Sequence, residues 1–267
     1  ATNPCGEQPL LGNESCNLGS INLAKFYQKA DEGSSFGWND KIDWARLESV
    51  TRKSVHFLDN VIDANKYATP EIEHMTKSTR KIMSKVREWA DDESKVLAKS
   101  RGAFPAWKDS NYNKETEVYR NHCRLTVAPT GTISMIADTS SGIEPTFALA
   151  WKKQNILEGK TLNYVNKYFE ADAIKHGFHS EDLMDYLAEG GSLATVPEVP
   201  DWAKAVYATA PDISPEDHVL MQSAFQSSCD SGISKTINFS NSATIEDVED
   251  AYMLAWKEGC KGITVYR

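Results

Sequence analysis

The C-terminal stretch of the chain constrains the fold more than any other part of the sequence. "ISKTINF" (233–239) is rich in β-branched and aromatic residues and predicts a strand, as does "KGITVYR" (261–267). "SATIEDVEDAYMLAWKEG" (242–259) predicts a helix between them, with Thr244 near its start and Gly259 at its end. A strand, a helix and a strand at this spacing form a βαβ unit, whose strands pair in parallel through a right-handed crossover. The sequence therefore predicts an α/β fold with more helix than sheet.

Composition places the chain among globular proteins and argues against several functions. The chain has 267 residues, enough for one large domain or two small ones, and 40% of them are hydrophobic and 25% charged, as is ordinary. The net charge of -9, without a basic stripe, argues against a nucleic-acid partner. No apolar run is long enough to cross a bilayer and no signal peptide is visible, which predicts a cytoplasmic protein with no membrane partner.

The cysteines show no disulfide or metal-binding pattern. They form no C-x-x-C pair, have no zinc-finger spacing with the histidines, and lie at Cys5, Cys16, Cys123, Cys229 and Cys260. An odd count in a chain of this size argues against a secreted disulfide scaffold, so reduced thiols and no metal site are predicted. The last three cysteines are expected to pack in the core, and each histidine to be solvated or buried in the core.

Other helices are indicated by apolar spacing and capping residues. Apolar residues at helical spacing predict a helix over residues 42–67, and residues 80–100 predict a charged helix that is solvated on one face. A long amphipathic region follows at 157–174. Ser180 and Ser214 are each predicted to cap a helix, because a serine hydroxyl can accept from the N–H groups of the first turn.

The N-terminal motif "NPCGEQ" raises a chemical question. Pro4 disfavours a helix, and in an extended chain Asn3, Cys5 and Glu7 point the same way. An amide, a thiol and a carboxylate would then face one space, with a second thiol available from Cys16. Such groups suit chemistry on a hydroxylated substrate. On the pattern alone, a surface loop that holds a cysteine is the favoured interpretation.

A second motif, "APTGTIS", follows a predicted short strand and contains Pro129, Thr130, Gly131, Thr132, Ile133 and Ser134. Gly131 lets a ligand approach the backbone, and successive N–H groups and hydroxyls are suited to hold a phosphate. The G-K-[ST] ending of a Walker loop is absent. "TSSGIEP" (139–145) has a similar composition. A plain turn remains the alternative for both motifs.

Six short blocks occur along the chain in a fixed order: "NPCGEQPL", "SCNLGSINLAKF", "APTGTIS", "SSGIEPTFAL", "AFQSSCDSGISKTINF" and "AYMLAWKEGCKGITVYR". In number, order and spacing, these blocks resemble those of the catalytic subunit of the class II, adenosylcobalamin-dependent ribonucleotide reductases. The resemblance extends from Asn3 to Arg267.

For the fold, this resemblance implies part of a ten-stranded α/β barrel of the ribonucleotide reductase and glycyl-radical type. Two parallel half-barrels form that barrel, and a loop threads its centre. Residues 1–267 would be its C-terminal part, namely the central loop and the second half-barrel. The first half-barrel would lie upstream of the chain. Residues 79–96 look shortened, so an internal deletion of a few dozen residues is expected near residues 82–83.

For function, the resemblance implies thiyl-radical reduction of ribonucleoside di- or triphosphates to 2′-deoxyribonucleotides for DNA synthesis. Cys5 matches the cysteine that becomes the radical, and Asn3 and Glu7 match the residues that flank it. Cys16 matches one of two cysteines that supply reducing electrons. Residues 129–134 match the loop that binds the substrate's phosphates. The implied cofactor is adenosylcobalamin, and the implied partners are a thioredoxin-type reductant and the N-terminal half of the reductase.

The residue types fit that chemistry. A thiyl radical can take hydrogen from C3′ of the ribose, because S–H and activated C–H bonds have similar strengths. Glu7 would act as general base toward the 3′-hydroxyl, and Asn3 would hold the ribose hydroxyls in place.

Activity is expected only when the upstream half is supplied, and two alternatives stay open. One is an inactive nucleotide-binding remnant, which the shortened segment favours and the retention of Asn3, Cys5, Glu7 and Cys16 disfavours. The other is a barrel relative with a different radical source, such as a glycyl radical or iron.

Overall fold

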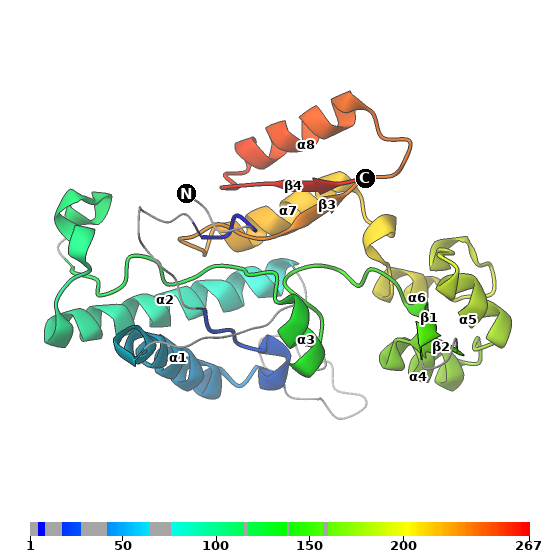
Figure 1. Ribbon diagram of the computed structural model, residues 1–267, viewed down its shortest axis with the longest axis horizontal. Helices are drawn as coiled ribbons and strands as arrows, with labels where there is room; N and C mark the ends of the chain where they lie inside the picture. Colours follow the sequence, from blue (N-terminus) through cyan, green and yellow to red (C-terminus); the bar gives the residue numbers. More distant parts are fainter. Residues whose placement is uncertain are drawn as a thin grey trace.

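The computed structural model arranges its helices and strands in three groups (Figure 1). One group contains the long helices α1 (Trp44–Ala64) and α2 (Thr76–Arg101). The second contains α7, α8 and the parallel strands β3 and β4, and the third contains the hairpin β1–β2 with α4, α5 and α6. The structure describes residues 5–8, 18–27, 42–64, 76–114, 117–137, 139–156 and 160–267.

The C-terminal βαβ unit is confirmed. Strands β3 (Thr236–Asn238) and β4 (Thr264–Tyr266) pair in parallel, and α8 (Ile245–Lys257) connects them. Thr244 and Asp247 cap α8 reciprocally: the Asp247 N–H donates to the Thr244 hydroxyl at 3.2 Å, and the Thr244 N–H donates to the Asp247 carboxylate at 2.7 Å. This local signal explains why the start of the helix was predictable.

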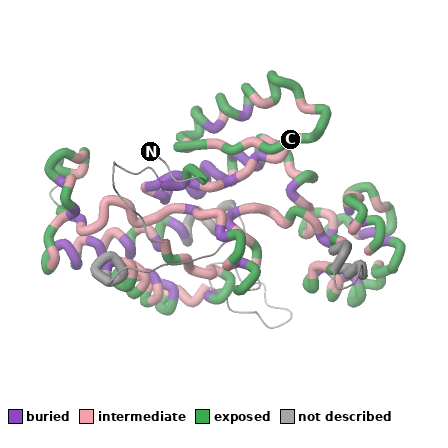
Figure 2. The backbone as a smooth tube through the Cα atoms, viewed as in Figure 1, coloured by how far each residue is buried: buried purple, intermediate pink, exposed green. Residues whose placement is uncertain are grey.

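Helix α7 (Pro215–Gln226) connects the upper and lower parts of the molecule. Ser214 caps it through a bond from the Asp217 N–H, as predicted. Val219 on α7 packs with the core residues of β3 and α8, whereas Phe225 packs with Met83 of α2. Figure 2 shows the resulting run of buried positions along this helix.

The two long helices form a layer below α7. Their interface buries Leu47 of α1 and both Val86 and Trp89 of α2, together with Phe26 from the short helix η1 (Leu23–Phe26). The predicted helices over 42–67 and 80–100 are therefore confirmed, and α2 exposes its charged face to solvent as expected.

The third group corrects one expectation. The amphipathic region 157–174 is divided between strand β2 (Lys160–Val165) and helix α4 (Lys167–His176). The division occurs because β2 pairs antiparallel with β1 (Ala150–Ile156), and the Asn166 side chain then accepts from the first N–H groups of α4. The described residues also form α5 (Glu181–Ala188), capped by Ser180 as predicted, α6 (Asp201–Val206), and the short η3 (Pro105–Asp109), η4 (Asn111–Lys114), η5 (Leu193–Thr195) and η6 (Ala210–Asp212).

The predicted strand ahead of "APTGTIS" is present only as a single parallel bridge, between Val127 and Ile233. Pro129 and the turn that follows end the pairing at once, before the short helix α3 (Gly131–Ala137) begins. Within the described residues, helices outnumber strands and the C-terminal strands are parallel, which confirms the α/β class.

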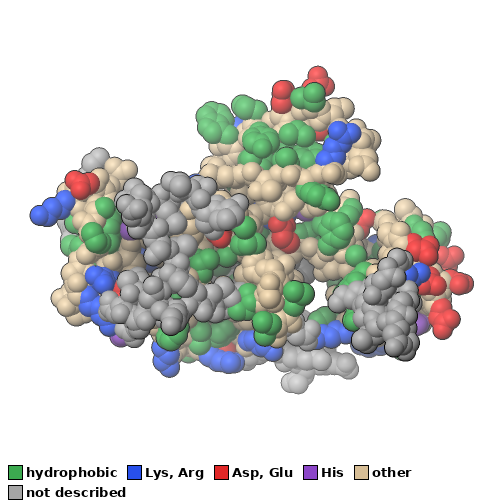
Figure 3. Space-filling view, in the orientation of Figure 1, with side chains coloured by type: hydrophobic (Ala, Val, Ile, Leu, Met, Phe, Trp, Pro, Cys, Tyr) green, Lys and Arg blue, Asp and Glu red, His purple; other side chains and the backbone are tan. Residues whose placement is uncertain are grey.

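Charge is distributed unevenly over the surface. Acidic side chains gather over the α4–α6 group in Figure 3, where Glu181, Asp182 and Asp185 on α5 are exposed. Helix α3 and the motif before it lie apart from this group in Figure 1. No helix in the described part of the chain combines the length and apolarity that a membrane span requires.

A buried carboxylate joins α1 to the segment after α2. Asp59 is fully buried, and its carboxylate accepts from Arg101 at 2.5 Å, from Arg120 at 3.0 Å and from Asn121 at 3.2 Å. A buried charge that loses its counter-charge is expensive, so these groups depend on one another.

We expect Asp59→Ala to lower the free energy of unfolding by about 3 kcal/mol, because two guanidinium groups lose their buried counter-charge. Urea denaturation would measure it. The control is Glu88→Ala, whose pair with Lys85 spans 2.6 Å but is about half exposed. That loss should stay below about 1 kcal/mol, and equal losses for the two variants would contradict the assignment.

Candidate active site

Two segments distant in sequence lie side by side at the centre of the molecule. The Ser231 N–H donates to the Leu125 carbonyl at 3.0 Å, and the Ser234 N–H donates to the Val127 carbonyl at 2.8 Å. The segment that leads into the "APTGTIS" motif is thus fixed against the segment that leads into β3.

The Cys5 loop, residues 5–8, attaches to these paired segments. The Gly232 N–H donates to the Glu7 carbonyl at 2.8 Å, and the Thr126 hydroxyl is shared between the Glu7 carbonyl at 3.1 Å and the Gly232 carbonyl at 2.9 Å. A Cβ atom at position 232 would lie 2.6 Å from the Gly6 carbonyl oxygen. Only glycine permits this approach, so position 232 determines where the loop sits.

This attachment places a thiol near a carboxylate. Cys5 is exposed to solvent, whereas Glu7 is 2% exposed, and its Oε2 has no hydrogen-bond partner among the described residues. Partial burial raises the pKa of the Cys5 thiol, and the nearby charge of Glu7 raises that pKa further. Cys5 therefore stays protonated at neutral pH, in the S–H form that exchanges hydrogen atoms. The other predicted catalytic residues, Asn3 and Cys16, lie outside the described residues.

The predicted phosphate loop, residues 129–134, is held by its own hydrogen bonds. Thr130 has a positive φ of 51°, which strains a β-branched residue, and its Oγ1 accepts from the Gly142 N–H at 2.7 Å. The Ser134 hydroxyl donates to the Gly131 carbonyl at 2.9 Å, so that its hydrogen is used within the loop. Thr132 is exposed. Backbone N–H groups and Thr132 are therefore better suited to a phosphate than the Ser134 hydroxyl.

The segment that contacts the Cys5 loop leads directly into the predicted phosphate loop. Thr126, which contacts the Cys5 loop, precedes Thr130 by four residues, a span of at most roughly 14 Å between Cα atoms. The structure thus brings Cys5 and Glu7 within reach of residues 129–134 through one continuous segment.

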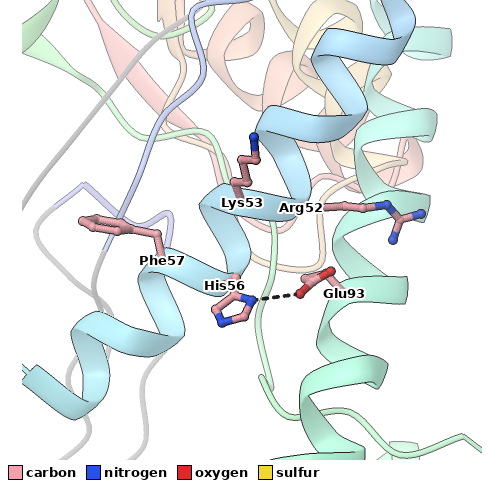
Figure 4. A pocket seen from close by; sticks show the side chains of 5 residues that line it. All are labelled: Arg52, Lys53, His56, Phe57 and Glu93. Carbon is pink, nitrogen blue, oxygen red and sulfur yellow. Dashed lines mark ion pairs between the residues drawn. The ribbon is translucent and has the colours of Figure 1, made fainter.

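A pocket elsewhere lies between α1 and α2 (Figure 4), and its lining residues are Arg52, Lys53, His56, Phe57 and Glu93. Its charges largely satisfy one another, because His56 pairs with Glu93 at 3.3 Å and Arg52 with Glu48 at 2.9 Å. It contains no predicted site residue. We therefore assign it to helix packing rather than to catalysis.

The remaining cysteines divide by environment. Cys229 is buried and Cys260 packs half-buried against the core below α8, as predicted. Cys123 corrects the expectation of core packing, because it is half-buried and its sulfur lies 3.1 Å from Nε2 of His122. In the described part of the chain, no cluster of three or more His, Cys, Asp and Glu side chains is placed to hold a metal ion.

Sequence reasoning missed a buried polar group beside the site. Lys235 is 2% exposed and contacts both Glu144 and His218. The available signal was the alternation of side chains: in the predicted strand over 233–239, Ile233, Lys235 and Ile237 share one face, and both isoleucines are in the core. A lysine on an inward face must be paired, which marks it for attention.

Comparison with known proteins identifies the family. The model of the ribonucleotide reductase barrel domain matches residues 1–83 and 106–266, so the chain belongs to this family. The resemblance seen in the sequence and the α/β barrel class are thereby confirmed.

Several curated relatives match the whole chain. It is 44% identical to the vitamin B12-dependent ribonucleoside-diphosphate reductase of Thermoplasma acidophilum, of which it covers 37%. It is 39% identical to the Mycobacterium tuberculosis protein of the same name, of which it covers 41%. The chain thus spans about two fifths of these relatives. A solved structure, the class Id ribonucleotide reductase alpha subunit of Actinobacillus ureae, shares the fold over 72% of this chain and 34% of its own, with a TM-score of 0.58 at 23% identity.

The carboxylate next to Cys5 predicts a change in thiol reactivity. Because the charge of Glu7 raises the pKa of Cys5, Glu7→Gln should lower that pKa and increase the thiolate fraction at pH 7.5. Since the thiolate is the nucleophile, we expect iodoacetamide to alkylate Cys5 about two- to fivefold faster. Peptide mass spectrometry would follow Cys5, with Glu88→Gln as the surface control. An unchanged or slower rate in Glu7→Gln would contradict the assignment.

Proposed function

We propose that this chain carries the thiyl-radical centre and the substrate phosphate loop of a ribonucleoside-diphosphate reductase. The observation that supports this most is the Cys5 loop, which presents an exposed thiol beside a buried carboxylate. Thr126 and Gly232 fix that loop at the segment leading into residues 129–134. The names of the curated relatives supply the diphosphate as substrate class.

The proposed reaction follows from the groups present. The Cys5 thiyl takes a hydrogen atom from C3′, which forms its S–H bond and leaves a carbon radical. Glu7 accepts the proton of the 3′-hydroxyl, for which its partnerless Oε2 is suited, while Asn3 holds the ribose hydroxyls. The 2′-hydroxyl leaves as water, and two thiols, one of them Cys16, supply two electrons and two protons and become a disulfide. Cys5 then returns its hydrogen to C3′ and Glu7 returns its proton to the 3′-oxygen, so the net change is one deoxyribonucleotide, one water and one disulfide per dithiol.

Adenosylcobalamin, the cofactor we propose, would supply the radical that oxidises Cys5. The exposure of Cys5 fits this, because a radical generated beside the loop can reach the sulfur directly. We assign none of the described residues to hold the corrin. Partial burial and the charge of Glu7 raise the pKa of Cys5 and so keep it as a thiol until that step.

Three further partners belong to the proposal. Residues 129–134 would bind the diphosphate through backbone N–H groups and Thr132. A thioredoxin-type protein would reduce the disulfide, which suits a cytoplasmic setting with reduced thiols. We propose residues 1–267 as the C-terminal part of the barrel domain, so the first half-barrel would be supplied by a further part of the reductase; the chain spans about two fifths of the curated relatives.

An inactive nucleotide-binding remnant is the second candidate, and a specific observation favours it. The alignment with the Thermoplasma relative extends over 297 positions against 267 residues in this chain, and the family model leaves residues 84–105 unmatched. Helix α2 runs unbroken through the point near residues 82–83 where a deletion is proposed. Loss of a barrel element there would leave phosphate binding intact while disrupting the reaction.

Turnover distinguishes the two candidates. We expect the chain, combined with a first half-barrel, to convert CDP to dCDP when adenosylcobalamin and dithiothreitol are supplied. Cys5→Ala should abolish product, because no other thiol occupies its loop, whereas Cys260→Ala should retain it. Chromatographic detection of dCDP measures both. A folded mixture that binds CDP and forms no product would favour the remnant.

A further inference from the structure

The buried Lys235 and His218 meet Glu144, which lies two residues from the Gly142 N–H that bonds to Thr130 of the phosphate loop. The Lys235 side chain is 1% exposed, and its ammonium lies 2.6 Å from Glu144 Oε2 and 2.8 Å from His218 Nδ1. It also donates to the Thr236 carbonyl at 2.7 Å. Removing an ammonium group from water is costly unless partners surround it, so this lysine is held in one position.

The protonation of His218 follows from its two contacts. Its Nε2 lies 3.2 Å from the Ala210 carbonyl, which can only accept, so Nε2 carries the hydrogen. Nδ1 therefore carries a lone pair and accepts a hydrogen bond from the Lys235 ammonium. Burial lowers the pKa of His218, and the charge of Lys235 lowers it further, in agreement with a neutral ring. The group therefore holds one cation and one anion.

Glu144 connects this group to the segment 141–146. While Oε2 contacts Lys235, Oε1 accepts from the Thr236 N–H at 2.6 Å, so both carboxylate oxygens are fixed by residues at the start of β3. Two residues further on, the Thr146 carbonyl accepts from the Ala210 N–H at 2.9 Å. Between Gly142 and Glu144, Ile143 is fully buried in the core. The segment is thus immobilised at successive points.

The other end of this segment holds the phosphate loop. The Gly142 N–H donates to the Thr130 hydroxyl at 2.7 Å, and Thr130 is the residue strained at positive φ. Such strain persists only where the surroundings enforce it. Glu144 lies two residues from Gly142, so the position of that N–H depends on the anchoring of Glu144.

We propose that Lys235 and Glu144, supported by His218, are positioning residues that hold loop 129–134 in its phosphate-binding conformation through Gly142 and Thr130. This inference rests on the proposed function for the identity of the ligand. Neither residue needs to contact the substrate: the ion pair fixes Glu144, Glu144 fixes Gly142, and Gly142 fixes Thr130.

Hydrogen exchange tests this without any substrate. In Lys235→Met, the backbone N–H groups of the stretch 129–142, which begin at Thr130 because Pro129 has none, should exchange about tenfold faster than in the unmodified chain, because the loop loses its anchor. Glu144→Gln should give a smaller acceleration, since glutamine keeps an oxygen for the Thr236 N–H. Amides of α5 should not change in either variant. Lys152→Met is the control, because Lys152 is likewise ion-paired, with Asp185 at 2.9 Å and Glu189 at 3.1 Å, but lies on the β1–β2 hairpin.

Unchanged exchange at 129–142, or equal acceleration in every segment, would overturn the inference. If Lys235→Met does not fold, the milder Glu144→Gln allows the same comparison of exchange rates between residues 129–142 and α5.

Binding adds a functional readout. In calorimetry, Lys235→Met should bind CDP about tenfold more weakly than the unmodified chain does. Its affinity for cytidine should change little, because only the phosphates of CDP would contact residues 129–134. Equal weakening for both ligands would overturn the inference. Failure of the unmodified chain to bind CDP would instead count against the proposed function, while the exchange result would still decide the role of the ion pair.

Discussion

The hydrogen bond from the Gly232 N–H to the Glu7 carbonyl is the contact on which the site depends. It joins the Cys5 loop to the segment before β3, and the Thr126 hydroxyl secures the same carbonyl from the other side. The bond exists because position 232 lacks a side chain, since a Cβ would contact the Gly6 carbonyl. A single glycine thus couples the N-terminal motif to the C-terminal βαβ unit.

The site combines groups whose environments differ in a chemically useful way. Cys5 is exposed and remains a thiol, whereas Glu7 is buried and keeps one oxygen without a partner in the described part of the chain. A hydrogen-atom carrier needs access to its radical source, and a general base benefits from burial. We propose that the strained Thr130 and the ion pair of the buried Lys235 with Glu144 support residues 129–134.

Local signals predicted much of the fold. The capping residues Ser214 and Thr244 mark helix starts through contacts within one turn, and the strand–helix–strand order at the C-terminus determines parallel pairing. The strand β2 was missed because its pairing with β1, rather than its own periodicity, decides its conformation. Similarly, the contact of Lys235 with Glu144 and His218 joins three segments that only the tertiary structure brings together. Motifs and the family resemblance nominate Cys5, Glu7 and loop 129–134 as site residues, whereas the close approach at Gly232 arises only in the tertiary structure.

The most direct measurement is a crystal structure of this chain, together with a first half-barrel, in complex with CDP. The proposed function predicts the diphosphate on the backbone N–H groups of residues 129–134 and the ribose C3′ at about 3.5 Å from the Cys5 sulfur. It also predicts a hydrogen bond from the 3′-hydroxyl to Glu7 Oε2. A diphosphate bound elsewhere, or a ribose facing away from Cys5, would contradict the assignment of these segments to one active site.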